Sequence, residues 1–367
     1  MLRLFSRETE HLVPVEADVL VRTPVPVDAP ALAGAGASDA PDLQSAPPAA
    51  RPTPMPIWFD LLNPDLQEIR LVEQSLGLNL PSRDEMEEIE LSARLYQEDG
   101  AEFMTMTVLA GLDGDDPVKT PVTFILKGTA LVTIRYADPK PFAGFLARAR
   151  RPNGLACVGG ETVMLGLIEA IIDRLADVLE RLGNEIDGVS REVFRAKSGQ
   201  GRGKANGKGK AGASTRDLQT LIEQIGREGD LLTATRESLV SISRLVAYHA
   251  ALELPARKVA KDVRQRVKLL QRDAGSLGDH AEFLQGKINF LLDATLGLIN
   301  LEQNQIIKIF TVASVAFLPP TLVASIYGMN FETMPELSWK IGYPMALGIM
   351  LLSALLPFLF FKRKGWL

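Results

Sequence analysis

The sequence predicts an α+β membrane protein: a cytoplasmic α/β domain, then long coiled-coil stalk helices, then two C-terminal transmembrane helices. Three observations predict this order. β-rich runs gather within residues 57–150, an apolar heptad pattern begins near Val263, and two long apolar runs close the chain. Heptad spacing is typical of coiled coils, and apolar runs of about 20 residues are long enough to cross a membrane.

The composition excludes several other classes of protein. The 367 residues are 46% hydrophobic and 23% charged, unlike a disulfide scaffold or a disordered polymer. The single cysteine, Cys157, leaves no internal disulfide, and the 3 histidines give no Cys/His metal cluster. A net charge of -5 argues against nucleic acid as a partner. Because no residues resemble a nucleophile–base pair or a phosphate-binding loop, we expect neither an enzyme nor an organic cofactor.

Residues 1–56 predict a disordered extension. They are rich in Ala and Pro, as in the run at residues 47–50, and they lack the apolar periodicity that offsets the entropy of ordering. No clean apolar stretch follows the charged start, so we expect no signal peptide and a cytoplasmic N-terminus.

Residues 57–150 predict the α/β domain. A short strand near residue 57 runs into Asn63 and Pro64, an N-cap and first-turn proline for a helix over 65–76. Ser82 and Glu85 form a capping box for a second helix. The β-rich runs that follow predict a mostly antiparallel sheet.

Residues 151–305 predict a helical domain and stalk. A first helix ends at a Gly/Lys-rich tract over 198–214, which we interpret as a flexible insertion between two antiparallel helices. A second helix covers 215–254, and Pro255 opens a third. If the third helix continues to residue 327, it has about 70 residues and a length of about 105 Å.

Residues 306–327 and 342–361 predict two membrane spans. The first contains one charged residue, Lys308, and the second contains none. The basic flanks, Lys308 and the tail at 362–367, place both ends of the hairpin in the cytoplasm by the positive-inside rule. The loop at 328–341 is then external, and its Glu332 and Glu336 would attract cations.

A polar stripe lies along one face of the first span. Helical spacing puts small hydroxyl residues on one side, and the same face continues to Asn304 and Asp293. Such a stripe mediates dry helix contacts or forms the wall of a conduit, which requires several copies because one face cannot enclose water. Apolar rings on this face would gate by dewetting. The stripe comprises Asn304, Ile307, Thr311, Ser314, Leu318, Thr321 and Ser325, of which Ile307 and Leu318 are the apolar members.

At the outer end of this stripe stands the tripeptide Gly328, Met329 and Asn330, between two spans at the C-terminus. A Met-Pro-Glu-Leu run and a terminal Lys-Arg-Lys-Gly-Trp-Leu follow it. With these motifs, residues 57–367 resemble the CorA family of divalent-cation channels. The resemblance implies a homopentamer in the inner (plasma) membrane that carries Mg²⁺, and also Co²⁺ and Ni²⁺.

The resemblance also implies roles for individual residues. The Gly-Met-Asn tripeptide would form the ion entry and selectivity site, and the stripe would line the pore. Asp293 would belong to a regulatory Mg²⁺ site between subunits, with Asp113 or Asp115 of the next subunit as its partner. Mg²⁺ would therefore be both the transported ion and the intracellular ligand that closes the pore.

The membrane potential would drive this transport, because moving two charges through 100 mV releases about 4.6 kcal/mol. Two alternatives remain open: a zinc transporter of the same superfamily, and a membrane-anchored coiled-coil scaffold that conducts nothing. The hydroxyl stripe argues against the scaffold, since an anchor needs no polar face.

Overall fold

The computed structural model describes most of the chain, in two compact units. The described residues are 1–8, 11–16, 20, 56–114, 117–151, 156–198, 210–252, 261–330, 334–335 and 339–365. The first unit combines Met1–Asp187 with Gly226–Ile288, and the second combines Gly188–Ile225 with Asn289–Leu367.

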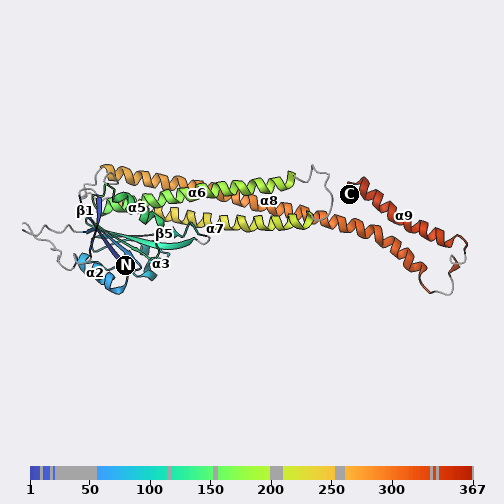
Figure 1. The fold of residues 1–367 in the computed structure, drawn as a ribbon, viewed down its shortest axis with the longest axis horizontal. Helices are drawn as coiled ribbons and strands as arrows, with labels where there is room; N and C mark the ends of the chain where they lie inside the picture. The colour runs from blue at the N-terminus through green and yellow to red at the C-terminus, as the bar shows by residue number, and fades with distance from the viewer. Residues whose placement is uncertain are drawn as a thin grey trace, which may run out of the picture. The chain divides into compact units, whose positions relative to one another are not determined.

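The first unit contains a seven-stranded sheet with the strand order β2-β1-β3-β7-β6-β5-β4 (Figure 1). Its neighbouring strands pair antiparallel, except for the parallel pair of β3 and β7. This arrangement matches the mostly antiparallel sheet that the sequence predicts. The strands are β1 (Leu2–Glu8), β2 (His11–Val15), β3 (Pro56–Leu62), β4 (Leu95–Glu98), β5 (Ala101–Ala110), β6 (Val118–Lys127) and β7 (Ala130–Arg135).

The prediction of a disordered extension over residues 1–56 is wrong at its beginning, where β1 and β2 join the sheet. Leu4, Phe5 and Leu12 are buried there, and the Phe5 ring stacks on Trp58 with 4.7 Å between ring centroids. Leu4 and Phe5 pack with side chains of β3, which lies some fifty residues further along the chain. Residues 17–19 and 21–55 lie outside the described part of the chain.

Three short helices follow β3: α2 (Leu66–Leu76), α3 (Arg83–Glu87) and α4 (Leu91–Arg94). The capping box of Ser82 and Glu85 is confirmed at the start of α3. The predicted cap of α2 is wrong by two positions, because Asp65 accepts the capping hydrogen bonds. Asn63 instead adopts a left-handed backbone with a φ of 44°, so the chain turns before the helix begins.

A buried ion pair fixes the parallel strand pair at the centre of the sheet. The Asp60 carboxylate on β3 accepts from the Arg135 guanidinium on β7 at 2.8 Å, and the two side chains are 2% and 1% exposed. Asp60 also accepts from the Thr133 hydroxyl, which in turn accepts from the Trp58 indole N–H at 3.0 Å. The side-chain polar groups of these four residues therefore have partners, as burial requires.

Four helices follow the sheet: α5 (Lys140–Ala149), α6 (Gly160–Ser198), α7 (Lys210–Ala251) and α8 (Lys261–Tyr327). α8 is continuous over 67 residues, which confirms the long third helix. The predicted insertion over 198–214 needs a correction, since residues 210–214 form the first turn of α7. Residues 199–209 and 253–260 lie outside the described part.

Most of the apolar positions in the heptad pattern of α8 are buried. In the first unit Val267, Leu270 and Ala274 are at most 4% exposed, as the predicted seam requires. In the second unit Leu291 and the polar exception, Thr295, are also buried. The Thr295 hydroxyl donates to the Leu291 carbonyl at 2.7 Å, so this polar side chain is satisfied within its own helix.

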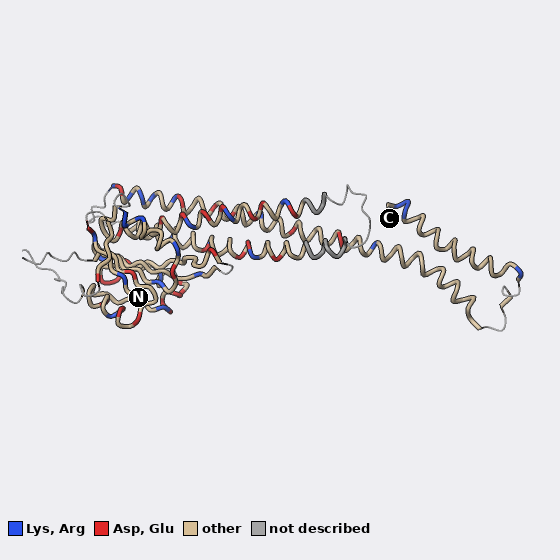
Figure 2. The backbone as a smooth tube through the Cα atoms, in the orientation of Figure 1, with Lys and Arg blue, Asp and Glu red and all other residues tan. Residues whose placement is uncertain are grey.

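The last third of α8 and the helix α9 (Gly342–Arg363) are the two transmembrane helices. Both are long and apolar enough to cross a membrane, and 6% of each apolar window is buried. Figure 2 shows charged residues along α6, α7 and the first part of α8, and almost none along these two segments. Within the described residues of the spans only Val312 and Ala346 are buried. Such extensive apolar exposure requires lipid or other subunits as its environment.

Candidate functional site

The polar face of the first span forms a groove on α8. Four of the predicted stripe residues line this groove together: Ser314, Leu318, Thr321 and Ser325. Its volume is about 440 Å³. Phe317 and Leu322 also line it. The polarity of the stripe did not select these two residues, although helical spacing places both beside Leu318 and Thr321.

The hydroxyl groups on this face are oriented by the helix itself. The Thr311 hydroxyl donates to the Ile307 carbonyl at 2.8 Å, and the Thr321 hydroxyl donates to the Phe317 carbonyl at 2.7 Å. With its hydrogen used inside the helix, each hydroxyl oxygen keeps its lone pairs for other donors. The face therefore presents hydrogen-bond acceptors, which suit the water molecules that surround a cation.

Two prolines interrupt the hydrogen bonding of α8 in the middle of the span. Pro319 and Pro320 lie inside the helix and have no backbone N–H. The carbonyls of Val315 and Ala316 therefore lose their donors at position i+4. The next carbonyl, that of Phe317, gains the Thr321 hydroxyl as an additional donor. The span thus carries a local set of acceptors that an uninterrupted helix lacks.

The signature tripeptide lies where α8 ends. The Gly328 N–H donates to the Ala324 carbonyl at 3.0 Å, and the Met329 N–H donates to the Ile326 carbonyl at 3.3 Å. Asn330 follows outside the helix and is exposed, as are its two neighbours in the tripeptide. The tripeptide therefore lies directly beyond the span that carries the polar face.

The two predicted external acids, Glu332 and Glu336, lie outside the described residues, and so does Asp115. Asp113 is described, and it is paired within its own unit. Its carboxylate contacts the Lys140 ammonium and the Arg174 guanidinium. The hydrogen bond from Lys140, with the contribution of Arg174, holds the pKa of Asp113 below its usual value.

The predicted ligands of the regulatory metal site belong to different units. Asp293 is an exposed residue of α8 in the second unit, whereas Asp113 belongs to the first. Among the described residues, no group of three or more His, Cys, Asp or Glu side chains is placed to hold a metal ion. The regulatory role of Asp293 stays a prediction.

These features define a class: a two-span membrane protein with a large sheet-and-helix domain and an exposed polar face on its first span. A family model described as "CorA-like Mg²⁺ transporter protein" matches residues 55–363. The chain belongs to this family, which confirms the resemblance inferred from the Gly-Met-Asn motif. Because the family consists of transport proteins, the expectation of a non-enzyme is also confirmed.

Curated relatives agree with this assignment. A protein named "Magnesium transport protein CorA" from Pasteurella multocida is 37% identical over 311 residues, covering 85% of this chain and 92% of the relative. The protein of the same name from Haemophilus influenzae is 38% identical over 312 residues, with the same coverage of both chains.

Solved structures support the fold. The complete structure of the CorA magnesium transporter from Methanocaldococcus jannaschii has a TM-score of 0.66 at 19% identity, over 84% of this chain and 91% of that one. The full-length CmaX protein has a TM-score of 0.59 at 16% identity, over 84% of this chain and 88% of that one. At these identities the likeness concerns the fold alone.

Proposed function

We propose that this protein is a homopentameric Mg²⁺ channel of the inner membrane, driven by the membrane potential. The observation that supports this most strongly is the polar face of α8, which runs from Asn304 to Ser325, with Asn330 shortly beyond the end of the helix. A single such face cannot enclose water, so conduction requires several copies around an axis. The groove at Ser314, Leu318 and Thr321 is open in the single chain, as a lumen-facing surface would be.

Asn330 is the proposed selectivity residue. Mg²⁺ holds its water shell tightly and gives it up reluctantly. A ring of neutral amide oxygens accepts hydrogen bonds from this bound water without trapping the charge, whereas carboxylates would bind the ion more tightly and slow its exit. Gly328 and Met329 complete the entry site, and Glu332 and Glu336 concentrate cations in the external loop.

Ile307 and Leu318 are the proposed apolar constrictions of the pore. Their side chains are 60% and 68% exposed in the single chain, although both are large and apolar. In a pentamer whose fivefold axis is lined by the five α8 helices, each of these positions would contribute five side chains to a ring. Rings of this kind close a pore by excluding water rather than by binding the ion.

Intracellular Mg²⁺ is the proposed gating ligand, bound between Asp293 and a carboxylate of the next subunit. Asp113 satisfies this role only if the ion displaces Lys140 and Arg174 from its carboxylate. A divalent ion that bridges two carboxylates would hold adjacent stalk helices together, and its loss would leave like charges facing each other. Asp115 remains the second candidate. Both chain termini face the cytoplasm in this arrangement.

The test is ion flux through the purified full-length protein in liposomes, with Mg²⁺, Co²⁺, Ni²⁺ and Zn²⁺ compared under an imposed potential. We expect Asn330→Ala to abolish Mg²⁺ flux while the protein still inserts and assembles. Ser353→Ala is the matched control, because this polar residue lies on the second span and its hydroxyl donates to the Met350 carbonyl. It should leave flux unchanged.

Two outcomes would contradict the proposal. Mg²⁺ flux retained in Asn330→Ala would remove the selectivity role of the amide. Flux of Zn²⁺ without Mg²⁺ in the unmodified protein would favour the zinc transporter, and the absence of any flux would favour the scaffold.

A further inference from the structure

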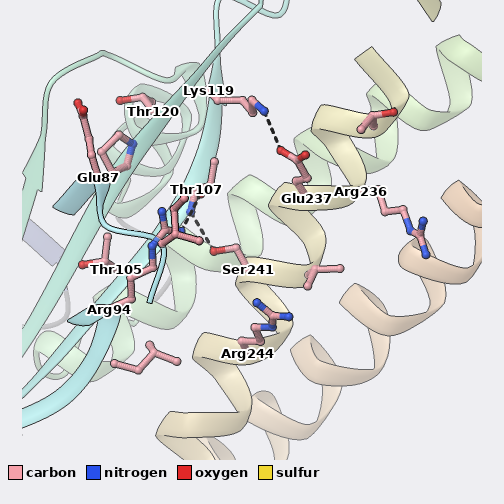
Figure 3. A pocket seen from close by; sticks show the side chains of 15 residues that line it. Glu87, Arg94, Thr105, Thr107, Lys119, Thr120, Arg236, Glu237, Ser241 and Arg244 are labelled. Carbon is pink, nitrogen blue, oxygen red and sulfur yellow. Dashed lines mark hydrogen bonds and ion pairs between the residues drawn. The ribbon is translucent and has the colours of Figure 1, made fainter. Parts of the chain in front are cut away.

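A second cavity lies in the first unit, far along the chain from the motifs of the spans. Strands β5 and β6 form one wall, the α3–α4 segment forms an edge, and α7 forms the opposite wall (Figure 3). Its volume is about 760 Å³, within the range of pockets that hold small molecules. The proposed ion path uses none of its residues.

The cavity is lined by more cations than anions. Arg94, Lys119, Arg236 and Arg244 belong to its lining, together with Glu87 and Glu237. Four of these six charges are already paired: Lys119 and Glu237 with each other at 2.8 Å, Arg236 with Glu282 at 3.5 Å, and Glu87 with Arg83 at 3.0 Å.

Arg94 and Arg244 have no carboxylate partner among the described residues, and they approach the cavity from different elements. Arg94 ends α4, beside the sheet, whereas Arg244 extends from α7 on the other side (Figure 3). Two arginines without a paired carboxylate leave the lining with an excess of positive charge, which favours an anionic ligand.

The Arg94 side chain is held in place before any ligand arrives. Its guanidinium donates to the Thr107 hydroxyl at 3.3 Å and to the Glu88 carbonyl. Thr107 is itself fixed, because its backbone N–H donates to the Ser241 hydroxyl of α7 at 2.9 Å. These contacts position Arg94 yet neutralise none of its charge. A positioned guanidinium binds two oxygens of a phosphate or carboxylate group through two parallel hydrogen bonds.

The rest of the lining is apolar or carries a hydroxyl. Leu95, Pro121 and Val240 line the cavity, and Ile89 stands at its edge with 90% of its side chain exposed. Inorganic phosphate is too small and too polar to cover these apolar side chains, which would stay in contact with water. A ligand with an organic part covers them, and this burial adds to the binding energy.

We propose that this cavity binds an organic phosphate, with Arg94 and Arg244 holding the phosphate group and the apolar lining covering the organic part. Lys119 joins them when the anion displaces the Glu237 carboxylate. Glu237 is therefore a competitor of the ligand, so that removing its charge strengthens binding.

The test is calorimetric titration of the full-length protein in Mg²⁺-free buffer with ATP, AMP and inorganic phosphate. We expect saturable binding of ATP and AMP, and binding of inorganic phosphate that is at least about tenfold weaker. Arg244→Ala should weaken ATP binding by about tenfold or more, since a charge-assisted pair is lost. Glu237→Gln should strengthen it, an opposite sign that a loss of structure would not produce. Arg94→Ala should weaken it as Arg244→Ala does.

Arg272→Ala is the matched control, because Arg272 is an exposed arginine of α8 that does not line the cavity. It should bind ATP as the unmodified protein does. The absence of saturable ATP and AMP binding would overturn the proposal, and so would equal affinity for inorganic phosphate and AMP. Binding that is unchanged in Arg244→Ala would overturn it as well. Because titration measures no ion flux, the result is independent of the proposed transport.

Discussion

The Gly328 N–H donates to the Ala324 carbonyl at 3.0 Å, and a β-carbon added to Gly328 would lie 3.1 Å from that same oxygen. Such a separation is tighter than ordinary van der Waals contact. The last turn of α8 therefore leaves little room for a side chain at Gly328, two positions before the exposed Asn330.

Gly328→Ala should reduce Mg²⁺ flux while leaving assembly intact. The added methyl group must push against the backbone of the last turn, at a local cost of about 1–3 kcal/mol. The relaxation would displace Asn330, which follows directly. Liposome flux of the full-length variant measures the effect. Gly348→Ala is the control, because a β-carbon there meets no atom within 4 Å. Equal flux in the two variants would show that the contact with Ala324 has no influence on transport.

Leu318→Asn should increase ion leak when internal Mg²⁺ is high. Leu318 is 68% exposed on the polar face. In the proposed pore a ring of leucines excludes water from the constriction, whereas a ring of amides would hydrogen-bond water and keep the constriction hydrated. Single-channel or liposome recordings at high internal Mg²⁺ detect the leak. Leu318→Met preserves the apolar character and should leave the closed state tight. A closed state equally tight in Leu318→Asn would argue against a hydrophobic gate at this level.

The ion pair of Asp60 and Arg135 should be essential to the stability of the sheet. Asp60→Ala removes the main partner of the Arg135 guanidinium, which is 1% exposed. Breaking a buried pair in this way should lower the free energy of unfolding by about 3–5 kcal/mol. Thermal unfolding of the full-length protein, followed by circular dichroism, measures it. Asp138→Ala is the control, because Asp138 also contacts Arg135 but is 55% exposed. Its removal should cost about 1 kcal/mol or less. Similar losses in both variants would contradict this distinction.

The contribution of His249 to the stability of the first unit should be largest below neutral pH. Its Nδ1 contacts the Glu102 carboxylate at 2.8 Å and its Nε2 contacts Glu161 at 3.2 Å. Burial alone lowers the pKa of His249, but the hydrogen bonds to Glu102 and Glu161 outweigh burial and raise the pKa to about 9. Protonation therefore stabilises the folded state, on the order of 3 kcal/mol.

This contribution is complete below pH 6.5, the ordinary pKa of histidine, and is lost as the pH rises through about 9. The difference in melting temperature between the unmodified protein and His249→Gln should therefore be largest near pH 6 and shrink toward pH 10. His280→Gln serves as the control, since no ion pair involves this exposed histidine in the described residues. A difference that stays constant from pH 6 to pH 10 would contradict the prediction.

Local patterns in the sequence predict the helical and membrane parts of this protein well. The polar stripe, the apolar spans and the capping box at Ser82 depend on residues a few positions apart, so a single helix period reveals them. For the same reason Phe317 and Leu322 could have been added to the groove from helical spacing alone.

Features that depend on distant residues could not be predicted in this way. β1 has few apolar residues, and it is ordered because Leu4 pairs with Phe59 on β3. The sequence near Asp113 does not reveal its ion-pair partners, Lys140 and Arg174, which the fold brings to its carboxylate. These contacts arise from tertiary packing, which no short window of sequence contains.

The parallel pair of β3 and β7 sets an order of events during synthesis. Trp58 on β3 lies opposite Leu131 on β7, so the centre of the sheet cannot form until the ribosome has made β7. The first span begins about 170 residues later, which takes roughly 9–34 s at ~5–20 residues per second. Pairing of strands takes milliseconds to seconds. The membrane-insertion machinery therefore receives the two apolar helices only after the strands of the nascent chain have had time to pair.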